Sequence, residues 1–191
     1  MRIIGGSLRG RRLGAVPKRG VRPTADPVRE ALFNILGPDV VGHFFIDLCA
    51  GTGAVGFEAL SRGARPVVLV EKSRVALRAI DSNIERLALG DAAHLRVVRA
   101  DVQAWLAQAG PLEGPGVVYV DPPYGERRTG RWVDALVGTG GLLPAGALAV
   151  VEHRSGHPPL VTAGRPSWTR RYGDTSLSAW AASRETGAES R

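Results

Sequence analysis

The chain has 191 residues, of which 44% are hydrophobic, so it is long enough for one domain and too apolar for wholesale disorder. No apolar run is long enough to cross a bilayer, and the single cysteine, Cys49, excludes an internal disulfide. We therefore expect a cytoplasmic protein, and we expect it to be a monomer.

The first predicted element is basic. The net charge is +7 at pH 7, and no acidic residue precedes Asp26. The pattern RIIGGSLRGRRL over residues 2–13 predicts a short strand, a glycine-rich turn and a second strand. A patch of one sign indicates contact with a polyanion, with a solvated arm as the alternative. Arginine replaces lysine along nearly the whole chain, which genomic base composition explains as well as phosphate contact does. We predict an RNA-contacting extension over residues 1–26, with contacts from Arg2, Arg9, Arg11, Arg12, Lys18 and Arg19.

A helix is predicted directly after this extension. Asp26 can cap it, and Pro27 occupies the first helical position, where a missing N–H costs nothing. Gly37 and Pro38 mark its end. The residues expected on its apolar face are Val28, Ala31, Leu32 and Ile35.

From residue 44 the pattern alternates between apolar strands and helices, which predicts an α/β domain over residues 27–182 with a parallel sheet covered on both faces. A Gly-Asp-Thr turn near the end predicts an antiparallel pair of strands at 168–172 and 176–181. Residues 183–191 are polar, and we expect a frayed tail. The other strands are predicted at 44–48, 67–71, 95–99, 116–120 and 146–152, and the helices at about 54–62, 74–89, 102–109 and 130–138.

A glycine-rich loop follows the first of these strands. Gly51, Gly53 and Gly56 match G-x-G-x-x-G, a pattern that also indicates a dinucleotide site. Asp47 precedes the loop at the strand end, where a carboxylate would repel a pyrophosphate but can face a cationic ligand. Because S-adenosylmethionine carries a sulfonium and an ammonium group, we favour it as the cofactor. We interpret Cys49 as a small buried residue rather than a nucleophile.

Two further acids follow the next two strands. Glu71 ends the second strand, where a carboxylate can bind ribose hydroxyls; a solvated charge is the alternative. Asp101 follows the third strand, where it can accept a hydrogen bond from the adenine amine or simply cap the next helix.

The fourth strand ends in Asp121-Pro122-Pro123-Tyr124. The two prolines stiffen this turn and leave carbonyl acceptors without N–H donors. A rigid corner with a carboxylate, bare carbonyls and an aromatic ring can hold a flat group that carries an N–H₂, such as a nucleobase amine. A packed loop aromatic is the alternative for Tyr124.

Together the motifs RIIGG, RPTADPVREALFNIL, DLCAGTGAVGFEALSRGA, DPPY and YGDTSLSAW resemble the RsmD family of bacterial small-subunit ribosomal RNA guanine-N2 methyltransferases. The resemblance covers nearly the whole chain. It implies a doubly wound seven-stranded, mostly parallel, Rossmann-like sheet with a small N-terminal extension, S-adenosylmethionine as cofactor, and a guanine in small-subunit ribosomal RNA, free or in a partly assembled subunit, as substrate.

The predicted site follows from the motifs and the resemblance. Asp121 and the Pro122 carbonyl would hold the guanine N2 amine, and Tyr124 would stack on the extruded base. The loop with Arg22 and Thr24 is expected to close over the methionine end of the cofactor, although it could equally serve only to begin the helix. The catalytic residues are Asp121, Pro122, Pro123 and Tyr124, and the cofactor-binding residues are Arg22, Thr24, Asp47, Ala50, Gly51, Thr52, Gly53, Glu71, Lys72, Asp101 and Val102.

Three other functions share parts of this pattern. DNA adenine-N6 methyltransferases share the DPPY turn, but a sequence-specific DNA enzyme usually needs a separate reading domain. An NAD-dependent oxidoreductase would leave the DPPY turn and the basic extension unexplained. An RNA-binding assembly factor with an inactive cofactor pocket would not need Asp47, Glu71 and Asp121 together.

Overall fold

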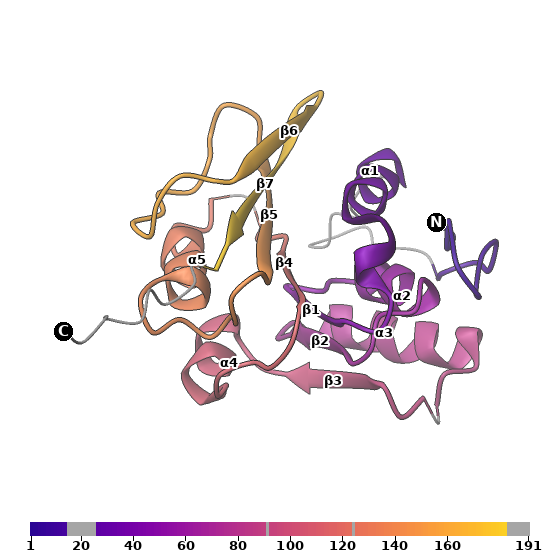
Figure 1. Cartoon of the computed structure of the whole chain (residues 1–191). Helices are drawn as coiled ribbons and strands as arrows, with labels where there is room; N and C mark the ends of the chain where they lie inside the picture. The colour runs from indigo at the N-terminus through magenta and orange to yellow at the C-terminus, as the bar shows by residue number, and fades with distance from the viewer. Residues whose placement is uncertain (15–25, 91, 124, 183–191) are drawn as a thin grey trace.

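The computed structural model describes residues 1–14, 26–90, 92–123 and 125–182. A seven-stranded sheet with the order β3-β2-β1-β4-β5-β7-β6 forms its centre (Figure 1). Strands β1 to β5 are parallel, and β7 runs antiparallel to both β5 and β6. The predicted doubly wound, mostly parallel α/β fold is confirmed. The strands are β1 (Phe44–Leu48), β2 (Val67–Glu71), β3 (Leu95–Arg99), β4 (Gly116–Val120), β5 (Leu148–Arg154), β6 (Trp168–Tyr172) and β7 (Thr175–Ala181).

Helices cover both faces of the sheet, so the central strands are buried on both sides. All five side chains of β1 are buried, because successive side chains of a strand point to opposite faces. Phe45 packs in one hydrophobic cluster with residues of α1, α2 and α3. Ile46 packs in a second cluster with residues of α4 and α5. The helices are α1 (Asp26–Leu36), α2 (Ala54–Ser61), α3 (Arg74–Leu87), α4 (Val102–Gln108) and α5 (Thr129–Val137), with a short 3-10 helix η1 (Gly37–Val40).

The N-terminal extension forms one isolated bridge, between Arg2 and Arg12, where the sequence predicts two strands. Backbone hydrogen bonds still join its two arms, from the Ile3 N–H to the Arg11 carbonyl at 3.0 Å and from the Leu13 N–H to the Met1 carbonyl at 3.1 Å. Other amides of the extension bind α2. The Ile4 and Gly5 N–H groups donate to the two carboxylate oxygens of Glu58 at 2.7 and 2.8 Å. Because Glu58 is fully buried, these bonds fasten the extension to the main domain.

Helix α1 buries a face turned slightly from the predicted one. Ala31 is only half-buried and Ile35 is 39% exposed, so the predicted face is wrong at these two positions. The reason is Arg29, whose buried guanidinium donates to the Arg2 carbonyl at 2.6 Å and to the Asp26 carboxylate at 3.1 Å. The buried residues of α1 are Val28, Arg29, Leu32, Phe33 and Leu36.

The bounds of β1 to β4 and β6 agree with the prediction. Strand β5 covers Leu148–Arg154 instead of residues 146–152, because Gly146 adopts a φ of +87° and turns the chain before the strand begins. Helix α3 ends two residues earlier than predicted, because Ala88 adopts a left-handed φ of +55°. Within the part of the chain that the structure describes, no helix has the length and apolar character needed to span a membrane.

Candidate active site

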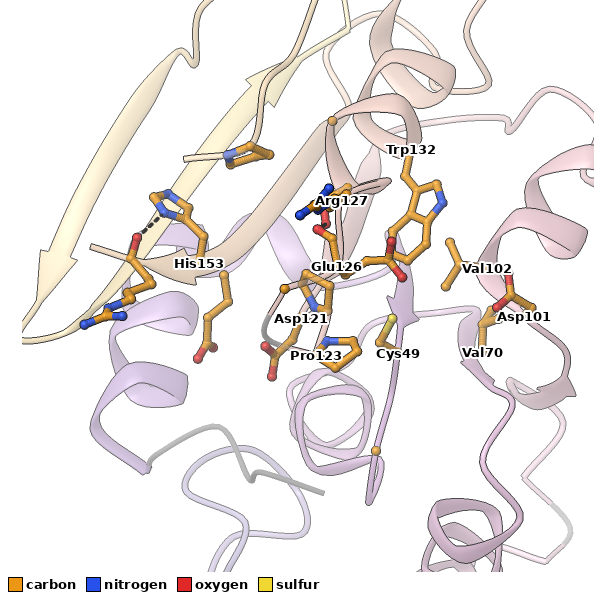
Figure 2. A pocket seen from close by; sticks show the side chains of 18 of the residues that line it. Cys49, Val70, Asp101, Val102, Asp121, Pro123, Glu126, Arg127, Trp132 and His153 are labelled. Carbon is orange, nitrogen blue, oxygen red and sulfur yellow. Dashed lines mark hydrogen bonds between the residues drawn. The ribbon is translucent and has the colours of Figure 1, made fainter. Parts of the chain in front are cut away.

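A cavity of about 1140 Å³ opens where β1, β2, β4 and β5 end. In the sheet, β1 lies between β2 and β4, so this is the point where the strand order reverses and where open α/β sheets bind ligands. Figure 2 shows Cys49, Asp101, Asp121 and Glu126 around the cavity. Its volume suits a small-molecule ligand together with part of a second one.

The glycine loop after β1 forms one wall of the cavity through Gly51. Gly51 and Gly53 have φ values of +58° and +77°, which side chains with a Cβ rarely adopt. Gly56 lets α2 approach β2 closely, because a Cβ there would lie 2.1 Å from the Leu69 Cδ2 atom. The loop is therefore shaped by backbone requirements at all three glycines.

Asp47 lies beneath this loop and is not among the residues that line the cavity. It is 2% exposed, and its Oδ2 atom accepts a hydrogen bond from the Gly56 N–H at 3.0 Å. Burial raises the pKa of Asp47 to about 8, against the effect of that bond. In the structure Asp47 thus supports the glycine loop from below, whereas the sequence predicts that it faces the ligand.

Glu71 joins the glycine loop to the end of β2. Its Oε2 atom accepts from the Gly51 N–H at 2.8 Å, and its Oε1 atom accepts from the N–H groups of Lys72 and Ser73 at 2.9 and 2.8 Å. These bonds hold the carboxylate at the cavity wall. The alternative of a solvated strand-end charge is wrong, because Glu71 is only 9% exposed.

Asp101 caps α4. Capping was the alternative interpretation of this residue, beside a role in adenine binding. Its Oδ1 atom accepts from the Gln103 N–H at 2.9 Å, and its Oδ2 atom pairs with the Lys72 ammonium at 2.8 Å. The hydrogen bond from Lys72, followed by that from Gln103, lowers the pKa of Asp101. Asp101 also lines the cavity beside Val102, so capping and ligand binding are compatible here.

The proline corner follows β4, the strand next to β1. The Asp121 N–H donates to the Leu48 carbonyl at 3.3 Å, which ties the corner to the end of β1. Asp121, Pro122 and Pro123 line the same cavity as Gly51. Tyr124 lies outside the described residues.

Cys49 lies between the loop and the corner, and Figure 2 shows its sulfur directed into the space beside Pro123. Burial, followed by the charges of Glu71, Asp121 and Asp47, raises the pKa of the Cys49 thiol. A thiol that resists ionisation is a poor nucleophile, which agrees with that part of its interpretation. The prediction that Cys49 is buried is wrong, because Cys49 is only half-buried and lines the cavity.

The predicted site residues therefore fall into three groups. The predicted residues that line the cavity are Gly51, Glu71, Lys72, Asp101, Val102, Asp121, Pro122 and Pro123. Asp47, Ala50, Thr52 and Gly53 lie behind this lining as part of the loop and its support. Arg22, Thr24 and Tyr124 fall outside the described residues, as do Lys18 and Arg19 of the predicted RNA contacts.

Sequence reasoning missed the wall formed by β5, β7 and the segment after the proline corner. Glu152 and His153 come from β5, and Thr175 begins β7. Glu126 is held by Arg128, which lowers the pKa of that carboxyl to about 2. A polar Glu-His pair ending an apolar strand was the available signal. Other residues of this wall are Arg127, Thr129, Arg154, His157 and Asp174.

The N-terminal extension lies near the last turn of α3 (Figure 1). The Arg11 guanidinium donates to the carbonyls of Leu87 and Arg86 at 2.8 Å each, so it caps the end of α3. That helix has 14 residues and is therefore about 20 Å long. Arg9 and Arg12 are exposed beside it, which leaves them accessible to a large substrate.

Comparisons with known proteins identify the family. The family described as Conserved hypothetical protein 95 matches residues 1–181. Ribosomal RNA small subunit methyltransferase D of Escherichia coli strain K12 is 44% identical over 124 residues, which are 65% of this chain and 60% of the relative. The protein of the same name from Haemophilus influenzae is 33% identical over 169 residues, which are 88% of this chain and 85% of that protein.

A solved structure of a candidate methyltransferase, yhhF of Escherichia coli, has a TM-score of 0.79 and 36% identity and covers 95% of this chain and 97% of its own. Since the family match covers nearly the whole chain, this protein belongs to the Conserved hypothetical protein 95 family, which is the RsmD family that its motifs resemble.

Proposed function

We propose that the protein transfers a methyl group from S-adenosylmethionine to the N2 amine of a guanine in small-subunit ribosomal RNA. The observation that carries this proposal is that Gly51 and Asp121 line one cavity, so a donor on the glycine loop would face an amine at the proline corner. The names of the Escherichia coli and Haemophilus influenzae relatives support ribosomal RNA as the substrate. The substrate is the free RNA or a partly assembled small subunit.

The residues near β2 and α4 fit the nucleoside part of the cofactor. Glu71 presents a carboxylate at the cavity wall, as a ribose requires, and Val70 and Val102 provide apolar surface for a flat base. The ring of Trp132, which lies beside Val102 (Figure 2), adds to this apolar surface.

The proline corner fits the amine that receives the methyl group. S-Adenosylmethionine, when bound, supplies an electrophilic methyl group. The Asp121 carboxylate and the Pro122 carbonyl accept the two N–H bonds of the guanine amine and turn its nitrogen lone pair toward the glycine loop. Holding two reacting groups in line can remove roughly 7–11 kcal/mol of a barrier.

The corner also accounts for the proton that the reaction releases. Methylation makes the nitrogen acidic, so the Asp121 carboxylate or solvent can take its proton without a strong base. Tyr124, adjacent in sequence, is proposed to stack on the extruded guanine, an interaction worth about 1–3 kcal/mol. Tyr124→Ala is therefore expected to lower turnover more than cofactor affinity.

The test compares substrates directly. The purified protein is incubated with S-adenosylmethionine and either small-subunit ribosomal RNA, partly assembled subunits or duplex DNA, and the modified nucleotides are mapped by mass spectrometry. We expect N2-methylguanosine at one position of the RNA and no modification of the DNA. N6-methyladenine in the DNA would instead establish the adenine-methylating alternative, and no product on any substrate would reject methyl transfer.

A further inference from the structure

A second carboxylate stands beside Asp121 in the wall of the cavity. Glu152, in β5, is 9% exposed and lines the cavity. The hydroxyl of Tyr119, a fully buried residue of β4, donates to its Oε2 atom at 2.6 Å. A short hydrogen bond from a buried ring fixes the position of the carboxylate, so Glu152 presents its charge to the cavity in a defined place.

The strand register brings Glu152 next to Asp121. Strands β4 and β5 are parallel and pair Tyr119 with Val150 and Val120 with Val151, so the next positions in register are Asp121 and Glu152. Adjacent strands are about 4.8 Å apart. Tyr119 and Asp121 are two residues apart and point to the same face, and the bond from Tyr119 directs Glu152 to that face as well.

Two carboxylates side by side match one nucleobase edge better than any other. Guanine presents two kinds of donor next to each other, the N1–H and the N2 amine. Adenine presents an acceptor, N1, beside its N6 amine, and that acceptor would face a carboxylate unfavourably. Enzymes that extrude a base commonly recognise it through hydrogen bonds to this edge.

We propose that Glu152 determines base specificity by accepting the guanine N1–H while Asp121 and the Pro122 carbonyl hold the N2 amine. Tyr119 is the positioning residue that orients the Glu152 carboxylate. This inference rests on the proposed function, because it assigns the base-reading part of the same site. It also gives a physical reason for a corner shared with adenine methyltransferases to act on guanine.

The charge of Glu152 makes the discrimination strong. A buried carboxylate that loses its donor retains the cost of desolvation, and hydrogen bonds to charged groups are stronger than those between neutral groups. A base with an acceptor at N1 should therefore react about 10- to 100-fold more slowly than guanine. A purely structural Tyr119–Glu152 pair would affect stability and leave the choice of base unchanged.

The experiment uses 2-aminopurine, which keeps the N2 amine but has an acceptor at N1. Small-subunit ribosomal RNA is assembled by ligation with guanine or 2-aminopurine at the nucleotide that the wild-type protein methylates, and kcat/KM is measured for both. The variants are Glu152→Gln, Tyr119→Phe and Glu113→Gln, a matched control that removes the same charge at an exposed position before β4.

We expect the wild-type protein and Glu113→Gln to prefer guanine about 10- to 100-fold. Glu152→Gln should lower that preference to about threefold or less, because its amide can also donate to the N1 acceptor. Tyr119→Phe should give an intermediate preference with normal cofactor affinity. A wild-type preference kept by Glu152→Gln, or abolished equally by Glu113→Gln, would overturn the inference.

A binding measurement covers the case in which Glu152→Gln is too slow to assay. RNA with inosine at the target keeps the N1–H and lacks the amine, so it should inhibit the wild-type protein more strongly than RNA with adenosine there. The Glu152→Gln variant should bind the inosine RNA and the adenosine RNA equally well, as measured by their competition with labelled RNA that carries guanine at the target. Retention of the wild-type difference would reject the role of Glu152, whereas failure of wild-type protein to methylate any guanine would instead reject the proposed function.

Discussion

The two ends of the cavity are built in different ways. At the end formed by β2 and α4, carboxylates hold backbone amides, as Glu71 holds the N–H groups of Gly51 and Ser73. At the end formed by β4 and β5, side chains from neighbouring strands face the cavity together, as Asp121 and Glu152 do. The first end shapes a loop around a ligand, whereas the second offers acceptors to a reacting group. We expect substitutions at the two ends to change different kinetic constants.

The largest effect is expected at the proline corner. Asp121→Ala removes a carboxylate that we assign to the reacting amine, and loss of one such preorganised group commonly lowers kcat about 10²–10³-fold. Cofactor affinity should change less than about threefold. That is less than the loss of one charged hydrogen bond to the cofactor would cause. Single-turnover methyl transfer and calorimetric titration with S-adenosylhomocysteine measure the two constants. Near-normal turnover in this variant would remove Asp121 from the mechanism.

A smaller effect on a different constant is expected at the other end. Glu71→Ala leaves the N–H groups of Gly51 and Ser73 without their acceptor and removes the carboxylate that we assign to the ribose. Loss of a charged hydrogen bond of about 1.5–3 kcal/mol lowers cofactor affinity about 10- to 100-fold. Titration with S-adenosylhomocysteine measures this, with Glu113→Gln as the control.

Saturating cofactor should restore most of the turnover of Glu71→Ala but none of the turnover of Asp121→Ala. If both variants instead had low turnover that excess cofactor did not restore, the two ends of the cavity would not be separable. That outcome would mean that the glycine loop and the proline corner act as one unit.

The role of Asp47 in supporting the glycine loop can be tested without a substrate. The pKa of Asp47 is raised from its usual value of 3.8 to about 8, so between these values the folded protein holds a proton that the unfolded chain has released. Stability that this group contributes at low pH is therefore lost as pH rises toward 8, by up to about 1.4 kcal/mol per pH unit.

Asp47→Asn keeps an acceptor for the Gly56 N–H and removes the titration. Urea unfolding of both proteins between pH 5 and pH 8 should show a steeper fall in the free energy of unfolding for the wild type. Parallel curves would show that Asp47 is ionised in the folded protein, in which case it could pair with a cationic ligand, as the sequence predicts.

The sequence predicts cavity residues that follow a strand end better than cavity residues that lie inside a strand, for a physical reason. Gly51, Glu71 and Asp101 each lie at or just after the end of a strand, and the carboxyl ends of parallel strands meet at one edge. Glu152 lies within β5, between an apolar run and a polar end. Its position next to Asp121 depends on the pairing of β4 with β5, which no local pattern specifies.

The sequence also did not predict which charged residues are buried. The helical pattern of α1 predicts an apolar face, but Arg29 is fully buried. Its Nη2 atom donates to the Arg2 carbonyl and the Asp26 carboxylate, and its Nε atom lies 3.6 Å from the buried Glu58 carboxylate. Similarly, Glu58 is buried because it accepts N–H groups from residues more than fifty positions away. Such bonds between distant segments override the preference of charged side chains for water.

The smallest expected effect concerns the N-terminal extension, which lies away from both ends of the cavity. Arg9 and Arg12 are exposed, whereas Arg11 caps α3. Arg9→Ala with Arg12→Ala should weaken RNA binding and lower the slope of log affinity against log salt by about 0.7–0.9 for each phosphate that is no longer neutralised. Fluorescence anisotropy with small-subunit ribosomal RNA at several salt concentrations measures this slope.

Arg11→Ala separates the structural role of an arginine in this extension from its electrostatic one. It removes the bonds to the Leu87 and Arg86 carbonyls, so the melting temperature should fall, while the salt slope should change less than in the double variant. An unchanged slope in the double variant would show that the extension serves to pack against α2 and α3. The phosphate-binding residues would then belong to the β5–β7 side of the cavity, where Arg127, Arg154 and His157 line the wall.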